Sequence, residues 1–159
     1  MDSKMLSIPR RYGSAARDAV EVAPRVIVVT MTDDARVTVV VDAANCVGSV
    51  PDGWWRDRAG ATRRLRDSIS PEALRRELDL EAAPEVVLVV EGRARGVEST
   101  EVVRVVDSPG SGDDMIVEVV EDLASEGREI VIVTADRGLR ARVVEHGART
   151  VGPRVVRPA

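Results

Sequence analysis

Three runs rich in valine and isoleucine, each ending in a carboxylate, stand out along the chain. They are RVTVVVD (36–42), EVVLVVE (85–91) and REIVIVTAD (128–136). Apolar runs of this length are typical of strands that are buried on both faces of a parallel sheet. A fourth run, EVVRVVD (101–107), alternates more strictly and indicates a strand nearer the edge. The link before this fourth run is short for a crossover between parallel neighbours, so its strand could be displaced.

The segments between these runs carry apolar residues at helical spacing. One of them begins with Ser70 as a good N-cap and Pro71 at the first helical position, which is typical of a helix start. Because strands alternate with helices, the pattern predicts an α/β fold, a three-layer sandwich with a mostly parallel central sheet. The expected helices are 55–69, 70–78, 113–127 and 136–147, and 148–156 is expected to hold a last short strand.

The length of 159 residues suits a single domain. Residues 1–35 are patterned more weakly, although PRVIVVTM (24–31) could form a strand. We therefore expect residues 1–35 to be an N-terminal extension that could be poorly ordered. Residues 36–159 are expected to form one domain.

Composition narrows the classes of protein that fit. Hydrophobic residues make up 44% of the chain and charged residues 31%, as in soluble globular proteins. No apolar run approaches the roughly 20 residues that span a bilayer, and the first residues lack the apolar stretch of a secretory signal. Cys46 is the only cysteine, which excludes internal disulfides and thiolate metal clusters. We expect a cytoplasmic protein that does not bind membranes.

Acidic side chains follow the predicted strands. Asp42, Glu91 and Asp136 stand at strand ends, and Asp113 and Asp114 open the helix after the fourth run. Ligands bind outside the carboxyl ends of parallel strands, so these acids are expected to share one site. Two such charges about 4 Å apart repel each other by roughly 4 kcal/mol at an effective dielectric near 20. A divalent cation would relieve this repulsion, and oxygen ligands favour Mg²⁺ or Mn²⁺.

The same acids also have structural interpretations. Asp113 and Asp136 are good helix N-caps, and Glu91 alone could be a solvated residue at a strand end. The net charge of −4 argues against broad electrostatic attraction to nucleic acid, unless the charge is segregated within the fold. The joint pattern of acids, rather than any one of them, favours the functional interpretation.

Three motifs in a fixed order resemble a known family. They are D-x-x-N at Asp42 and Asn45, G-x-x-D-D-x-I over 110–116, and [ST]-x-D-R at Thr134, Asp136 and Arg137. This order is similar to that in the NYN branch of the PIN-like nucleases, especially the YacP-like group, over about residues 36–152. The resemblance implies a PIN-like, single-domain ribonuclease that depends on Mg²⁺ or Mn²⁺.

The resemblance also implies roles for individual residues. Asp42, Asp136 and either Asp113 or Asp114 would hold the metal, while Asn45 and Thr134 would orient the ligands or the attacking water. Relatives often carry Asp after the second strand, where this chain has Glu91. Glu91 would therefore bind the metal directly or through a water molecule.

Several basic and aromatic residues near these acids could contact a nucleic acid. Arg137, Arg93 and Arg56 are candidates for binding phosphates, although each could instead stabilise neighbouring acids. Trp54 and Trp55 could stack on a nucleobase. We favour the alternative that at least one of the two tryptophans fastens its helix to the core.

The sequence therefore predicts a metal-dependent endoribonuclease that hydrolyses RNA phosphodiesters with an activated water. The RNA could be single-stranded or structured, and a ribosome or another protein could present it; the oligomeric state stays open. One alternative is a metal-dependent phosphatase or nucleotide hydrolase. A haloacid-dehalogenase-type phosphatase would need a second aspartate where Ala44 stands. Another alternative is a non-catalytic RNA-binding regulatory domain on the same fold.

Overall fold

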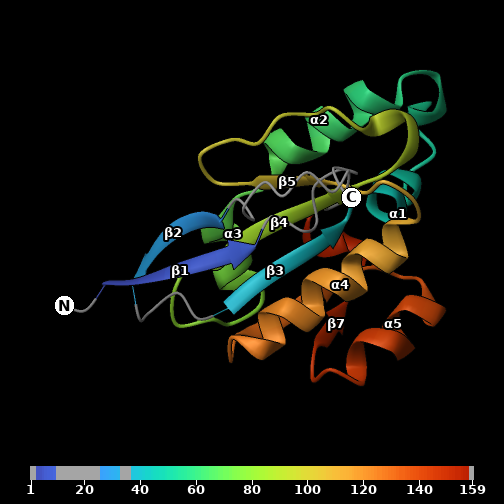
Figure 1. The fold of residues 1–159 in the computed structure, drawn as a ribbon. Helices are drawn as coiled ribbons and strands as arrows, with labels where there is room; N and C mark the ends of the chain where they lie inside the picture. Colours follow the sequence, from blue (N-terminus) through green and yellow to red (C-terminus); the bar gives the residue numbers. More distant parts are fainter. Residues whose placement is uncertain (1–2, 10–25, 33–36, 158–159) are drawn as a thin grey trace, which may run out of the picture.

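The structure is a computed structural model and describes residues 3–9, 26–32 and 37–157 (Figure 1). β1 (Ser3–Pro9) and β2 (Val26–Thr32) pair as a two-stranded antiparallel sheet. β2 confirms the strand expected at 24–31. The remaining residues of the expected N-terminal extension lie outside the described residues, so the predicted lack of order there is untested.

The central sheet has five strands in the order β5-β4-β3-β6-β7, and all neighbouring strands in it are parallel. β3 lies in the middle, with Asp42 opposite Val89 of β4 and Val41 opposite Val133 of β6. This arrangement confirms the predicted α/β class with a parallel sheet. The strands are β3 (Val37–Asp42), β4 (Glu85–Val90), β5 (Arg104–Asp107), β6 (Glu129–Val133) and β7 (Arg149–Val151).

Alternate residues of β3 face two separate apolar layers. Val39 and Val41 pack with residues of α1, α2 and α3, whereas Val40 packs with residues of α4 and α5. All three valines are fully buried, and each such side chain contributes about 1.5–3 kcal/mol. The predicted three-layer sandwich is thereby confirmed. The helices are α1 (Ala43–Gly48), α2 (Arg58–Ser68), α3 (Pro71–Glu77), α4 (Gly112–Ser125) and α5 (Arg137–Val144).

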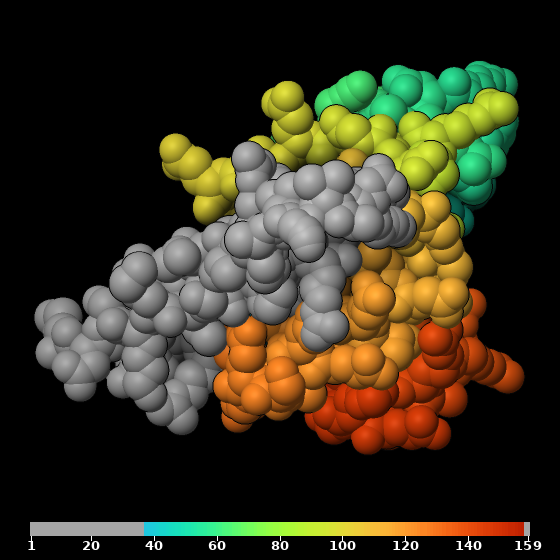
Figure 2. All heavy atoms as spheres, viewed as in Figure 1, coloured from blue at the N-terminus to red at the C-terminus, as the bar shows by residue number. Residues whose placement is uncertain are grey.

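The two helical layers lie on opposite sides of the sheet. Figure 1 shows α2 on one side and α4 with α5 on the other. In the space-filling view, the α1–α2 segment (green to teal) and the α4–α5 segment (orange to red) occupy opposite ends of the visible face (Figure 2). β3 is covered by both layers, so its carboxyl end lies between them. α1 starts directly at this end of the strand.

β5 confirms the edge position expected for the fourth run. The strand begins only at Arg104, so residues 91–103 are available for the crossover, and β5 pairs with β4 in parallel. Val97 and Val103 of this connection are buried. The connection is further held by Asp107, which accepts a hydrogen bond from the N–H of Gly96 at 3.2 Å. The suspected displacement of this strand is therefore wrong.

Side-chain caps define where the helices begin. Ser70 caps α3 and Pro71 is its first residue, as predicted, and Asp136 caps α5. The expectation that Asp113 caps its helix is wrong. Ser111 takes that role, accepting from the N–H of Asp114 at 3.4 Å, so the helix begins at Gly112 and Asp113 lies inside its first turn. The Asp113 carboxylate is thereby free of capping.

Within the described residues, none of the helices combines the length and the apolar character needed to cross a bilayer.

Candidate active site

Asp42 is the last residue of β3 and the N-cap of α1. Its Oδ1 accepts from the N–H of Asn45 at 3.2 Å, and its Oδ2 accepts from the hydroxyl of Thr134 at 2.9 Å. The residue is only 7% exposed. Burial raises the pKa of Asp42 from 3.8 to about 6; the two hydrogen bonds oppose this rise, and the charges of Asp113 and Glu91 add to it. Buried carboxylates with perturbed pKa values are typical of functional sites.

Asn45 and Thr134 join the ends of β3 and β6. The side-chain oxygen of Asn45 accepts from the N–H of Ala135 at 2.8 Å. The Thr134 hydroxyl donates to Asp42 and accepts from the N–H of Asp136 at 3.1 Å. Thr134 is fully buried, so its hydroxyl has no contact with bulk water. The two motif residues thus form one rigid network around Asp42.

Asp136 is both a helix cap and a neighbour of the other acids. Its Oδ1 accepts from the N–H of Leu139 at 2.8 Å, and its side chain lies at the surface. Its charge is the second-largest cause, after burial, of the raised pKa of Asp113. The structural and functional interpretations of Asp136 are therefore compatible.

The Asp113–Asp114 pair is divided between two environments. Asp113 is half-buried, and burial, Asp136 and Glu91 all raise the pKa of its carboxyl, while Arg142 opposes the rise. The side chain of Asp114 is 72% exposed and pairs with Nη2 of Arg142 at 3.0 Å. Of the two, Asp113 is the acid that faces the other carboxylates.

Glu91 links the end of β4 to the start of α4. One oxygen of its carboxylate accepts a hydrogen bond from the N–H of Gly112. A Cβ on residue 112 would lie 2.8 Å from that oxygen, so the contact requires glycine there unless Glu91 moves. The sequence motif contains Gly112 only as a variable position, and its role emerges from a contact distant in sequence.

These four acids lack ion-pair partners among the described residues, although the charge of Arg142 lowers the pKa of Asp113. Among the described residues, no arginine, lysine or histidine forms an ion pair with Asp42, Glu91, Asp113 or Asp136. The donors are all oxygens, which suits a hard divalent cation in kind and in charge. In the positions described, however, no group of three or more such side chains is close enough to share one ion. The site is an open cluster of acids with unbalanced negative charge.

The three arginines predicted to contact phosphate are all exposed. Arg137 is the first residue of α5, directly after Asp136; Arg93 lies in the 3₁₀ turn Gly92–Ala94; and Arg56 ends the 3₁₀ turn Trp54–Arg56. Arg140 has a different position, since its Nε donates to the carbonyl of Thr134 at 2.9 Å. Arg140 therefore braces the segment that carries Thr134, from the first turns of the helix that follows it.

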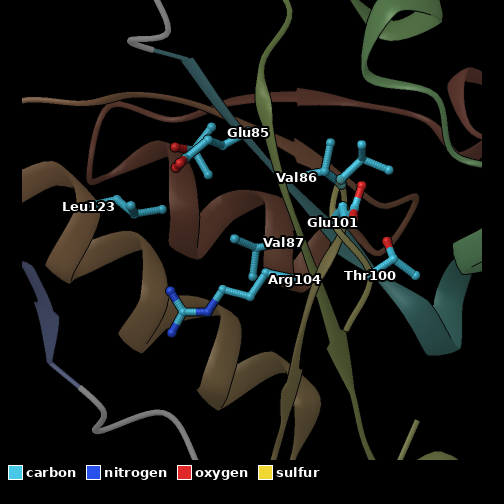
Figure 3. A pocket seen from close by; sticks show the side chains of 9 residues that line it. Glu85, Val86, Val87, Thr100, Glu101, Arg104 and Leu123 are labelled. Atoms are coloured by element: carbon cyan, nitrogen blue, oxygen red, sulfur yellow. The ribbon is translucent and has the colours of Figure 1, made fainter. Parts of the chain in front are cut away.

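Two pockets lie at opposite ends of the strands. One, of about 370 Å³, borders the acids through Glu91 and includes Ala43, Trp54 and Arg58. The other, of about 180 Å³, lies where β4 and β5 begin and is bordered by Glu85 and Arg104 (Figure 3). The first pocket is adjacent to the acid cluster, whereas the second is separated from it by the length of the sheet.

Comparison with known proteins gives a likeness in structure rather than in sequence. No protein-family model matches the chain, and no curated protein matches it in sequence. The crystal structure of Rae1 (YacP) from Bacillus subtilis matches with a TM-score of 0.58 and 18% identity, covering 75% of this chain and 70% of that one. Its W164L mutant matches with a TM-score of 0.57 and 18% identity, covering 75% and 71%. The chain therefore has a fold like that of Rae1 (YacP), which agrees with the fold that its motifs predict.

Proposed function

We propose that this protein is a metal-dependent endoribonuclease in which Asp42, Asp113 and Asp136 hold Mg²⁺ or Mn²⁺. The observation that supports this most directly is the convergence of acids from β3, β4, α4 and the end of β6, where Asp113 and Glu91 raise the pKa of Asp42. A bound cation would relieve the repulsion among these acids, because a nearby positive charge favours the ionised form of each carboxyl group. RNA as the substrate follows from the resemblance of the motifs to NYN ribonucleases.

The remaining residues of the cluster have supporting roles in this proposal. Glu91 binds the cation directly or through water, and Asn45 and Thr134 hold Asp42 in place. A bound cation supplies a more acidic water and neutralises charge that develops on the phosphate. In the hydrolysis, the water oxygen would bond to phosphorus as the bond to the leaving ribose oxygen breaks; the water would lose a proton to solvent, and the leaving ribose oxygen would take one up from solvent.

Basic residues around the cluster complete the proposed site. Arg137 lies directly after Asp136, so it is the arginine best placed to contact a phosphate near the acids. Arg93 and Arg56 lie on neighbouring turns and extend the positive charge away from the cluster. Such contacts position the RNA backbone without reading its sequence.

The test is cleavage of end-labelled single-stranded RNA in Mn²⁺, in Mg²⁺ and in EDTA. We expect internal cleavage with either metal and none with EDTA. Asp42→Asn and Asp136→Asn should each lower the rate by about 100-fold or more, the scale of losing one electrostatic contact to a transition state. Asp57→Asn is the matched control, because Asp57 also caps a helix, α2, but lies outside the acid cluster.

The alternatives give different results in the same assays. Release of inorganic phosphate from small esters, with internal RNA linkages intact, would identify a phosphatase or nucleotide hydrolase instead. RNA binding without cleavage in either metal, unchanged in both aspartate variants, would identify a non-catalytic binding domain. Both results contradict the proposed function.

A further inference from the structure

The pocket beside the acids is bordered by an aromatic ring and a guanidinium group, whereas the acid cluster itself consists of carboxylates. The guanidinium of Arg58 lies over the ring of Trp54, with 5.3 Å between its central carbon and the ring centroid. Both side chains border the pocket of about 370 Å³, together with Ala43 and Ala94. Aromatic rings and guanidinium planes are the surfaces on which unstacked nucleobases pack.

In the part of the chain that the structure describes, Arg58 is not paired with a carboxylate that would compete with a ligand. It forms no ion pair with any carboxylate among the described residues. Its contact with Trp54 fixes the guanidinium beside the pocket, and a cation held over an aromatic ring can also stack on a base. The wall is therefore an ordered, positively charged platform.

The size and charge of the pocket favour a base over a phosphate. A volume of about 370 Å³ is at the lower end of the range for small-molecule sites, about 300–1,000 Å³, so it suits one nucleobase or nucleoside. Glu91 also borders the pocket and would repel a phosphate. Ala43 and Ala44 follow Asp42 directly, so an occupant of the pocket is next to the acid cluster.

The two tryptophans differ in their relation to this pocket. Trp54 borders it and packs against the core, whereas Trp55 is 52% exposed and does not border it. Their rings meet edge to face with centroids 6.0 Å apart. The chain has only 2 tryptophans, so each substitution leaves a single fluorescent reporter at a defined place.

We infer that this pocket binds one nucleobase of single-stranded RNA, adjacent to the phosphate on which the acids act. The base stacks on the Trp54–Arg58 wall, and the backbone runs past Glu91 to the acid cluster. The identity of the ligand rests on the proposed function. The pocket selects for unpaired RNA, because a base inside a duplex cannot enter it.

The first measurement is tryptophan fluorescence of Trp55→Leu, in which Trp54 is the only tryptophan. Oligouridylate and oligoadenylate are titrated in EDTA, which prevents cleavage, and ribose 5-phosphate serves as a probe without a base. We expect both oligonucleotides to quench Trp54 and ribose 5-phosphate to leave it unchanged. Trp54→Leu, which retains Trp55, should show no comparable quenching.

The second measurement is the affinity of the variants for the same oligonucleotides. Trp54→Leu should weaken binding by about fivefold or more relative to Trp55→Leu, since stacking on one aromatic ring contributes at least that factor. Arg58→Gln should weaken binding more than Arg63→Gln, the matched control for loss of one charge. Arg63 is exposed on the same helix and does not border the pocket.

The outcomes separate this inference from the proposed function. If RNA is cleaved but Trp54 is not quenched and Arg58→Gln binds like Arg63→Gln, the pocket inference is overturned and the nuclease stands. If no divalent metal supports cleavage while oligonucleotides still quench Trp54, the nuclease is overturned and the base pocket stands. Should Trp54→Leu fail to fold, the comparison of Arg58→Gln with Arg63→Gln decides, because Arg58 is exposed.

Discussion

The hydroxyl of Thr134 donates a hydrogen bond to Oδ2 of Asp42 at 2.9 Å, although the two residues are 92 positions apart in sequence. The bond connects the end of β6 to the end of β3 across the centre of the sheet. It is one of two hydrogen bonds that lower the pKa of Asp42 against the effect of burial. The pKa of the central acid is therefore lowered by a residue that directly follows another strand.

Replacing Thr134 by valine removes this donor at nearly constant volume. We expect the pKa of Asp42 to rise above about 6, so that the acidic limb of any cleavage activity moves to higher pH. The loss of the buried hydrogen bonds should also lower the free energy of unfolding by about 1–3 kcal/mol. An NMR titration of the Asp42 carboxyl measures the pKa directly.

Thr38→Val is the control for this substitution. Thr38 is also fully buried in the sheet, but its hydroxyl accepts from Arg128 at 2.9 Å, at the opposite end of β3. The Thr38→Val variant should destabilise the fold without changing the pKa of Asp42. An equal movement in both variants would show that Thr134 acts through general stability rather than through its hydrogen bond.

Asp42→Asn should stabilise the metal-free protein at neutral pH. The pKa of Asp42 is raised from 3.8 to about 6 in the folded chain, so between these values the folded state holds a proton that the unfolded state has lost, and above about 6 the fold contains a buried charge that costs free energy. Its contribution to stability is greatest below pH 3.8 and falls as the pH rises through about 6. At about 1.4 kcal/mol per unit, the gain on substitution is on the order of 1–3 kcal/mol at pH 8.

Denaturant unfolding in EDTA over a range of pH measures this effect. The difference between Asp42→Asn and the unmodified chain should shrink as the pH falls below about 6 and be smallest near pH 4. A loss of stability that is the same at every pH would instead show that Asp42 serves only as the cap of α1.

Asp113 and Asp114 should respond differently to divalent metal. A ligand that binds only the folded state at 100 times its Kd stabilises it by about 2.7 kcal/mol. We expect Mn²⁺ to raise the melting temperature of the unmodified chain and Asp113→Asn to remove most of that rise. Asp114 pairs with Arg142 and points to solvent, so Asp114→Asn should retain most of it. The reverse order would assign the cation to Asp114.

Gly112→Ala tests the position of Glu91. The new Cβ would lie 2.8 Å from a carboxylate oxygen at the end of a flexible side chain, so Glu91 should move rather than the backbone. We expect a change in stability below about 1 kcal/mol but a clear loss of metal-induced stabilisation. In a Glu91→Ala background the same substitution should have no further effect. An additive loss would show that Gly112 acts independently of Glu91.

Much of the fold follows from local pattern. The runs that became β3, β4 and β6 are continuously apolar because both faces of each strand are covered, and this is visible in the sequence without any partner. Asp42 and Asp136 could be placed at strand ends for the same reason. Ser70 and Pro71 mark a helix start that is visible in the sequence, because the capping hydrogen bond from the N–H of Ala73 to the Ser70 hydroxyl spans only three residues.

The start of α4 could not be resolved in this way. Ser111, Asp113 and Asp114 are all good N-caps, so propensity alone does not choose among them. The choice depends on Glu91, which binds the N–H of Gly112 from a distant strand end. The separation of Asp113 from Asp114 likewise depends on Arg142 of the next helix. Contacts between segments far apart in sequence determine these details.

The strand order β5-β4-β3-β6-β7 places the reversal of winding between β3 and β6. The chain leaves β3 in one direction to build β4 and β5, and later returns to the other side of β3. Loops departing in opposite directions leave a crevice at such a point. The acids at this crevice lie outside both apolar layers, so exchanging a few of these side chains would alter the site without disturbing the scaffold.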